Sequence, residues 1–211
     1  PRQKMSCCSH EHHDHDHTDP TKGFEFTLYK FINTDSIRCL NELEDGSAQK
    51  VFKPYSERYD QDKFIESDAD EQLIIHIPFS GNVKITSIAI LGGDDGTCPS
   101  QLRAWINRED IDFQNADELK PTQKWSLADV SVFDGVRQKV LPSYATDPVS
   151  FQSISSLTLF FEDNHGADET KIYYIGLKGN FIETKVGVVE TTYEAKPIPQ
   201  DHQAIDDKKG A

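Results

Sequence analysis

Residues 73–91, LIIHIPFSGNVKITSIAIL, form the stretch of sequence that decides the fold. Apolar and β-branched residues dominate both of its halves, and Ser80-Gly81-Asn82 separates them. Ile and Val favour strands, whereas Gly and Asn favour turns because they tolerate unusual backbone angles. The stretch therefore predicts two antiparallel strands, residues 73–79 and 83–91, joined by a tight reversal.

Similar short runs continue along the chain and predict at least six strands in all. The later runs are residues 102–106, 138–141, 154–161, 171–177 and 186–193, with turns predicted at residues 92–96, 163–166 and 178–180. Because strand side chains alternate between two faces, we expect Val83, Ile85 and Ser87 to share one face, and Leu102, Ala104 and Ile106 to share another. Regularly spaced short strands are typical of an all-β sandwich.

Helical patterns are few. In residues 36–43 the apolar residues Ile37, Leu40 and Leu43 recur every three residues, and Asp35 precedes them as a plausible N-cap. This spacing predicts one short helix. Strands do not alternate with helices of about ten residues, so a parallel α/β sheet is disfavoured.

The two ends of the chain differ in composition from its centre. Residues 1–23 and 196–211 are polar and charged and carry no periodic apolar pattern. Such segments cannot bury enough apolar surface to offset the loss of chain entropy. We therefore predict a disordered His-rich tail at 1–23, one β-sandwich domain at 24–195 and a polar tail at 196–211.

The charge and the cysteines narrow the choice of partner and compartment. With 36 Asp and Glu against 22 Lys and Arg, the formal net charge is -14, which repels nucleic acid and anionic membranes. Only four cysteines occur, two of them adjacent, so a disulfide-stapled secreted scaffold is disfavoured. The N-terminal residues also lack the apolar run of a secretory signal. We expect a cytoplasmic protein, with nuclear access.

Two parts of the sequence carry metal-ligating residue types. The first is the N-terminal tail, with Cys7, Cys8, His10, His12, His13, His15 and His17. Imidazole and thiolate bind zinc, nickel and copper, yet ligands in a disordered run do not fix a closed shell, so adventitious binding is the favoured interpretation. The second is the set of carboxylates Glu66, Asp68, Asp70, Glu71, Asp94 and Asp95. Turn geometry explains these better than calcium does. No cofactor is predicted.

Enzyme signatures are missing from the sequence. No two cysteines are separated by two residues, as thioredoxin-type redox chemistry requires, and no G-x-S-x-G or H-E-x-x-H string occurs. Of the two histidines in the central region, His76 lies within an apolar strand and His165 in a predicted turn. We interpret the first as packed and the second as solvent-facing, and we predict a protein without enzymatic activity.

Several blocks of the sequence resemble the PITH domain, the C-terminal domain of proteasome-interacting thioredoxins. They are Phe52-Lys53-Pro54, residues 64–91, Pro99 to Arg103, residues 165–179, Tyr193-Glu194-Ala195 and Asp201-His202, so that the resemblance spans roughly residues 24–202. Without a thioredoxin half, the chain is similar to the stand-alone form, which often begins with a short His-rich tail.

The resemblance implies a jelly-roll β-sandwich, similar to galactose-binding-like domains, that associates with the 26S proteasome. The contact residues that we predict for it lie on the C-terminal segment: Tyr193, Glu194, Asp201 and His202. Jelly rolls of this kind also bind sugars on aromatic platforms, and Trp105, Trp125 and the tyrosines are candidates for such a surface. An intracellular carbohydrate- or small-ligand-binding module is therefore the alternative, although Trp105 in its strand is more simply interpreted as a half-buried sheet residue.

Overall fold

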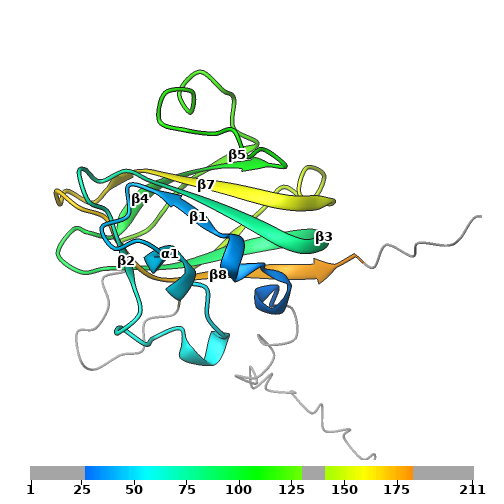
Figure 1. The fold of residues 1–211 in the computed structure, drawn as a ribbon, viewed down its shortest axis with the longest axis horizontal. Coiled ribbons are helices and arrows are strands. Elements are labelled where there is room, and N and C mark those ends of the chain that lie inside the picture. Colours follow the sequence, from blue (N-terminus) through cyan, green and yellow to red (C-terminus); the bar gives the residue numbers. More distant parts are fainter. Residues whose placement is uncertain (1–26, 130–140, 183–211) are drawn as a thin grey trace, which may run out of the picture.

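The protein, in a computed structural model that describes residues 27–129 and 141–182, has an all-β fold with antiparallel strands (Figure 1). The strands are β1 (Arg38–Leu40), β2 (Ile65–Glu66), β3 (Leu73–Gly92), β4 (Pro99–Ile106), β5 (Gln123–Ser126), β6 (Ser143–Ala145), β7 (Ile154–Asn164) and β8 (Lys171–Phe181). The helical turns are η1 (Tyr29–Phe31), η2 (Thr34–Ser36), α1 (Ser47–Lys50) and η3 (Tyr55–Glu57). No helix among the described residues is long and apolar enough to span a membrane.

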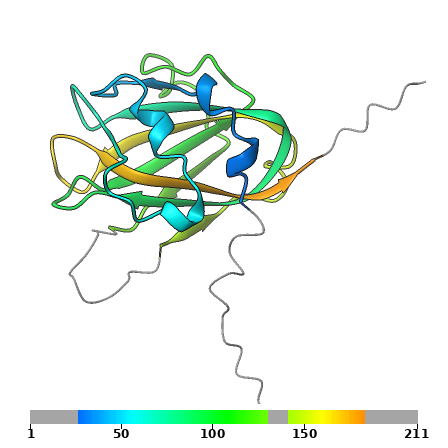
Figure 2. The ribbon, with the colours of Figure 1, turned by 60° about the horizontal axis from the view of Figure 1, so that its bottom comes forward.

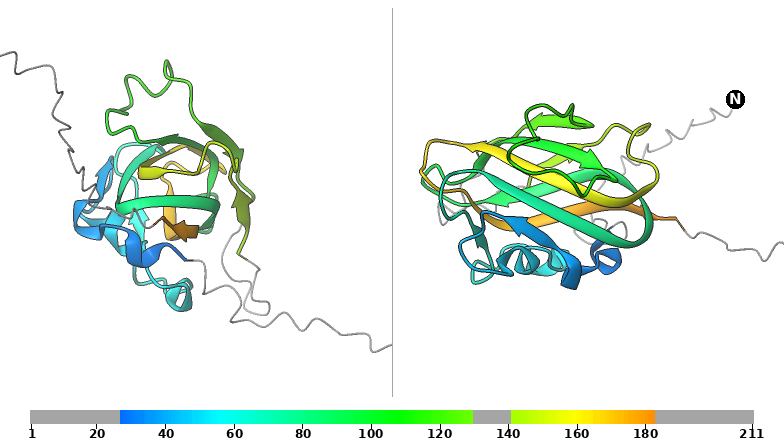
Figure 3. Two further views of the ribbon diagram at one scale, coloured as in Figure 1. Left: turned by 90° about the vertical axis from the view of Figure 1, so that its right-hand side faces the viewer. Right: turned by 45° about the horizontal axis from the view of Figure 1, so that its top comes forward.

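The long strand β3 belongs to both layers of the sandwich. Its first half lies between β1 and β7, with Ile75 opposite both Cys39 and Leu159. Its second half lies between β8 and β6, with Ile88 opposite both Leu177 and Tyr144. One layer is therefore β1, β3, β7, β4 and β5, and the other is β2, β8, β3 and β6. In the right-hand view of Figure 3, β3 (teal) curves round at one edge of the molecule.

The predicted reversal at Ser80-Gly81-Asn82 is wrong, because the chain continues through these residues as one strand. The regular pairing of β3 with β7 runs as far as Pro78, and the register then shifts. Val83 is the next paired residue, and it lies opposite both Ile154 of β7 and Phe181 of β8. Pro78 has no N–H to donate to a ladder, and glycine permits a sharp bend. The turn-type residues therefore mark the place where the strand passes from one layer to the other.

The hydrophobic core lies between the two layers. Ile75, Ile77 and Leu159 reach it from one layer, and Ile88 and Ile175 reach it from the other. Each fully buried side chain of this size contributes roughly 1.5–3 kcal/mol relative to exposure. Leu102 and Ala104 face this core and Ile106 packs against it, which confirms their predicted common face. The alternation of inward and outward side chains thus specifies the sandwich.

The helix predicted at residues 36–43 is wrong. Residues 34–36 form the short turn η2, and Arg38–Leu40 form β1, which pairs with β3. Leu40 and Leu43, which the helix would have buried, are 40% and 59% exposed. A short isolated helix is marginal in water, so pairing with an available strand edge overrides the local spacing.

Two further expectations fail in the second layer. The predicted turn at residues 178–180 is part of β8, where Gly179 lies opposite Ile85 of β3. Ser87 does not share the inward face of Val83 and Ile85, because the register shifts between Ile85 and Ser87 and brings Ile88 to the core instead. Such a bulge adds one residue and reverses the alternation that follows it.

Short elements cover the core at its open side. The helical turns, drawn in blue and cyan, lie together along one side of the sandwich in Figure 2 and in the right-hand view of Figure 3. Leu28, Val51 and Phe52 from this region are buried in the core. The strand predicted at 186–193, both predicted tails and all but Leu141 of the strand predicted at 138–141 lie outside the described residues.

Candidate functional site

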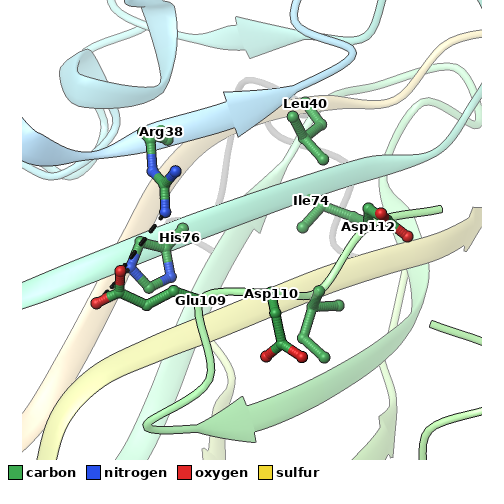
Figure 4. A pocket seen from close by; sticks show the side chains of 8 residues that line it. Arg38, Leu40, Ile74, His76, Glu109, Asp110 and Asp112 are labelled. Atoms are coloured by element: carbon green, nitrogen blue, oxygen red, sulfur yellow. Dashed lines mark ion pairs between the residues drawn. The ribbon is translucent and has the colours of Figure 1, made fainter. Parts of the chain in front are cut away.

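A cleft opens on the outer face of the layer that contains β1 and β3, and we call it the His76 cleft. It is lined by Arg38, Leu40, Ile74, His76 and residues 109–112, and its volume is about 260 Å³ (Figure 4). An adjoining hollow of about 410 Å³ shares Arg38, His76 and Glu109 and extends to Asp35. The strand residues Arg38, Leu40, Ile74 and His76 form the floor of the cleft. Successive strand residues point to opposite faces, so the intervening residues Cys39 and Ile75 face the core.

The wall of the cleft is held in place by the segment that follows β4. Asn107 adopts a left-handed backbone conformation with φ 53°. Its side-chain oxygen accepts hydrogen bonds from the main-chain nitrogen atoms of Ser155 (2.8 Å) and Ser156 (3.3 Å), at the start of β7. Farther along, Ile111 packs with Ile74 and Trp105 in a second, smaller apolar cluster. These contacts place Glu109 over the first half of β3.

His76 is buried, with 7% of its surface exposed, and its ring orientation is fixed by Thr158. The hydroxyl of Thr158 donates its proton to the carbonyl of Arg108 (2.7 Å). Its oxygen lies 3.0 Å from Nδ1 of His76, and it has no second proton to give. In the arrangement that satisfies both contacts of Thr158, Nδ1 carries the ring proton and donates it to the hydroxyl oxygen. The neutral imidazole consequently presents Nε2 to the cleft as a hydrogen-bond acceptor.

Charged side chains gather round this nitrogen. An oxygen of the Glu109 carboxylate lies 3.7 Å from Nε2 of His76, and the other lies 3.8 Å from the guanidinium of Arg38. Both distances exceed a normal hydrogen bond. Asp110 is paired with Arg108 instead, through two hydrogen bonds of 2.9 and 2.5 Å. Among the described residues, the carboxylate of Glu109 thus has only these two longer contacts to positively charged or polar groups of the cleft.

Burial lowers the pKa of His76 below its ordinary value of 6.5. The negative charge of Glu109 acts in the opposite direction, and the positive charge of Arg38 adds to the lowering. The imidazole is therefore neutral at pH 7, and its single proton is the one that Nδ1 donates to Thr158. Among the described residues, the hydroxyl next to His76 is that of Thr158, and it donates its proton to the main-chain carbonyl of Arg108. It is therefore not available as a nucleophile that His76 could activate, and the arrangement suits the binding of hydrogen-bond donors instead.

The predictions for the two central histidines are confirmed, because His76 is packed and His165 is exposed. The sequence did not reveal the cleft, although a histidine in an apolar strand and the run Glu109-Asp110 after another strand were both visible in it. Arg38 was assigned to the predicted helix. Without the pairing of β1 with β3, nothing in the sequence places Arg38 beside His76.

Two of the carboxylates considered as calcium ligands, Glu66 and Asp70, have partners within the protein. Glu66 lies 3.2 Å from Lys171, and Asp70 accepts a hydrogen bond of 2.7 Å from Asn41. Within residues 27–129 and 141–182, no three His, Cys, Asp or Glu side chains gather in a way that would hold a metal ion. Cys39 packs against the core as a free thiol, and Cys98 is buried.

The remaining predicted site residues lie outside the described residues, and their roles stay predictions. They are the contact residues Tyr193, Glu194, Asp201 and His202 and the tail ligands Cys7, Cys8, His10, His12, His13, His15 and His17.

Comparison with known proteins identifies the family. The model of the PITH domain matches residues 18–197. PITH domain-containing protein 1 of Dictyostelium discoideum is 41% identical over 197 residues, which cover 93% of each chain. PITH domain-containing protein 1 of Homo sapiens is 40% identical over 184 residues, or 86% of this chain and 83% of the human protein.

Solved structures confirm the jelly-roll architecture. The CBM32-1 and CBM32-2 domains of Clostridium perfringens ZmpB in complex with GalNAc superpose with a TM-score of 0.53 and 12% identity, covering 74% of this chain and 37% of that one. The structure of the same two domains described without a sugar gives a TM-score of 0.51, with 13% identity over 80% of this chain and 41% of that one. At such identity the likeness concerns the fold alone. The match of the family model and the identity to relatives along almost the whole sequence show that the chain belongs to the PITH domain family.

Proposed function

We propose that this chain is a non-enzymatic interaction module that associates with the 26S proteasome as an adaptor or regulator, in the cytoplasm and the nucleus. The observation that carries the proposal is the match of the PITH domain across residues 18–197. The proteasome is the partner that the resemblance to this family implies.

The chemistry of the described residues supports binding rather than catalysis. His76 is held by a hydroxyl whose proton is already directed at the carbonyl of Arg108. Cys39 packs against the core, and burial raises the pKa of its thiol far above the ordinary value, so the reactive thiolate is scarce at neutral pH. Neither of these groups has the environment of an activated nucleophile or of a redox centre.

A carbohydrate-binding function rests on similarity of fold alone. Trp105 is buried with 2% of its surface exposed, which is more than the half-burial expected for it. Trp125 packs on Phe151, and its indole N–H donates a hydrogen bond of 2.9 Å to the carbonyl of Ala145. Neither tryptophan ring is an open platform for a sugar, and no other observation favours this function, so we do not advance it as a second candidate.

The proposed contact is the C-terminal segment with Tyr193, Glu194, Asp201 and His202. Pro197 and Pro199 precede Asp201 and favour an extended backbone, which suits a segment that orders on binding. His202 offers an imidazole that can donate or accept a hydrogen bond in a partner's groove.

Affinity capture of the tagged full-length chain from cell extract, followed by quantitative mass spectrometry, tests the proposal. We expect enrichment of 26S proteasome subunits over a chain whose C-terminal segment has been scrambled. Truncation after Ala195 should weaken the capture, and His202→Ala should cause a smaller loss of the same kind. Failure of the full-length chain to enrich proteasome subunits contradicts the proposed partner, and unchanged capture after truncation contradicts the proposed contact segment.

A further inference from the structure

Two hydrogen-bond acceptors face each other across the His76 cleft. Nε2 of His76 and a carboxylate oxygen of Glu109 lie 3.7 Å apart, and the proton of the neutral ring is on the far nitrogen, where Thr158 fixes it. No proton therefore lies between the two acceptors. A nitrogen that carries two or three protons can approach both within hydrogen-bonding distance from the open side of the cleft.

The floor beside these acceptors is apolar. Leu40, 40% exposed, and the buried residues Ile74 and Ile111 line the same cleft. Long basic side chains lay their methylene groups along apolar surface while the charged end reaches a polar group. The apolar floor thus suits the methylene stem of a basic side chain, and the two acceptors suit its charged end.

The charges around the cleft favour a cation over an anion. Asp35, Glu109, Asp110 and Asp112 surround the cleft and its adjoining hollow. Arg38 is the one cationic side chain among the lining residues described, and Arg108 pairs with Asp110, so the four carboxylates still outnumber these two cations. Arg38 is 64% exposed at its side chain and lies 3.8 Å from Glu109, so it is free to move toward solvent. The whole chain also carries a net charge of -14, which draws basic surfaces toward it.

We propose that the His76 cleft binds the side chain of an arginine or lysine presented by a partner protein, with the cationic group bridging His76 and Glu109 and the methylene stem on Leu40, Ile74 and Ile111. This assignment rests on the proposed function as an interaction module, because it names one contact that such a module makes. The cleft is formed entirely by described residues, and its lining does not include the four residues proposed for the C-terminal contact.

Nuclear magnetic resonance of the full chain tests the assignment directly. The probes are Nα-acetyl-arginine amide and Nα-acetyl-lysine amide, and the signals are the methyl groups of Ile74 and Ile111 and the ring of His76. We expect saturable shifts at these three residues. Nα-acetyl-citrulline amide, which keeps the stem of arginine but lacks its charge, should bind much more weakly, as should Nα-acetyl-aspartate amide and free galactose.

Three exposed positions allow matched variants. Glu109→Gln should weaken arginine binding by about fivefold, the upper range for a solvent-exposed ion pair. Arg38→Gln should strengthen it, because a competing cation is removed. Glu169→Gln changes the same charge in the loop between β7 and β8, away from the cleft, and should have no effect.

Lowering the pH supplies an independent check. Arg38 from β1 and Glu109 from the segment after β4 are the charged groups that face His76. Once Nε2 takes up a proton it donates instead of accepting, so arginine binding should weaken as the pH falls below 6.5.

The assignment is overturned by any of four results: no shift with either cationic probe, citrulline binding equal to that of arginine, preferential binding of aspartate or galactose, or weaker arginine binding by Arg38→Gln. None of these results bears on whether the full chain captures proteasomes. Failure of the inference is therefore distinguishable from failure of the proposed function.

Discussion

A buried histidine is costly unless its polar atoms find partners, and His76 shows how one threonine satisfies half of the ring. Thr158 links Nδ1 of His76 to the carbonyl of Arg108, so one hydroxyl joins β3, β7 and the segment after β4. The same bond determines which nitrogen faces the cleft. The recognition chemistry of the outer sheet face is thus set by a side chain that does not itself line the cleft.

The titration of His76 follows from this environment. Because burial disfavours the imidazolium, its pKa lies below 6.5 in the folded protein, and proton-coupled stability is present above pH 6.5 and lost as the pH falls through the lowered value. We expect Glu109→Gln to lower this pKa further and Arg38→Gln to raise it. Following the His76 ring signals against pH would measure all three values. A midpoint above 6.5 in the unmodified protein would show that burial is not the dominant effect.

Cys39 gives a second test at the same scale. Burial, and to a lesser degree the charge of Glu42, raises the pKa of its thiol, so alkylation by iodoacetamide should be very slow in the folded protein at neutral pH. In denaturant the same thiol should react at the rate of an ordinary cysteine. Mass spectrometry of the peptide that contains Cys39 separates it from Cys7 and Cys8. Equal rates in the folded and denatured protein would contradict the packed position of Cys39.

Among the elements, β3 organises the molecule, because it supplies the floor of the cleft with one half and part of the second layer with the other. The composition was enough to predict strands on both sides of Ser80-Gly81-Asn82. The regular spacing of short strands along the chain was enough to predict a sandwich. The sequence did not separate a reversal from a bend. Gly and Asn serve both, and the difference depends on whether the two halves of the stretch pair with each other or, as here, with β7 and β8.

The same limit explains the other differences. Gly179 was assigned to a turn because glycine is frequent there, whereas the structure needs it for close approach of two paired strands. A Cβ atom at this position would lie 1.8 Å from the carbonyl oxygen of Lys84. Arg38 and Leu40 were assigned to a helix because local spacing carries no information about a strand edge at β3. In each case the local sequence pattern does not specify which strand the segment pairs with in the folded protein.

Replacement of Gly179 tests the strand assignment. Gly179→Ala should destabilise the protein by about 2 kcal/mol or more, since a backbone atom of β3 occupies the space that a methyl group needs. Asn180→Ala, at the exposed neighbouring position in β8, serves as the control and should change stability little. Urea unfolding of both variants gives the comparison. Two equally mild variants would favour the turn over the paired strand.

At the scale of the whole molecule, the two proposed contacts use different residues of the chain. The His76 cleft is built on a rigid sheet face, where β1 and β3 fix the floor and Asn107 anchors the wall. The proposed proteasome contact lies instead on the C-terminal segment. When one partner engages both the His76 cleft and the C-terminal segment, the second contact becomes intramolecular, so the combined affinity exceeds that of either contact alone.

Sedimentation of purified components tests the central claim most directly. Purified 26S proteasomes and the purified full-length chain are mixed and separated on a density gradient, with the chain truncated after Ala195 as the matched control. The account predicts that the full-length chain moves with the proteasome peak and that most of the truncated chain stays near the top. A full-length chain that remains at the top, at concentrations where known proteasome-binding proteins co-sediment, would contradict the proposal that this molecule is a proteasome-associated module.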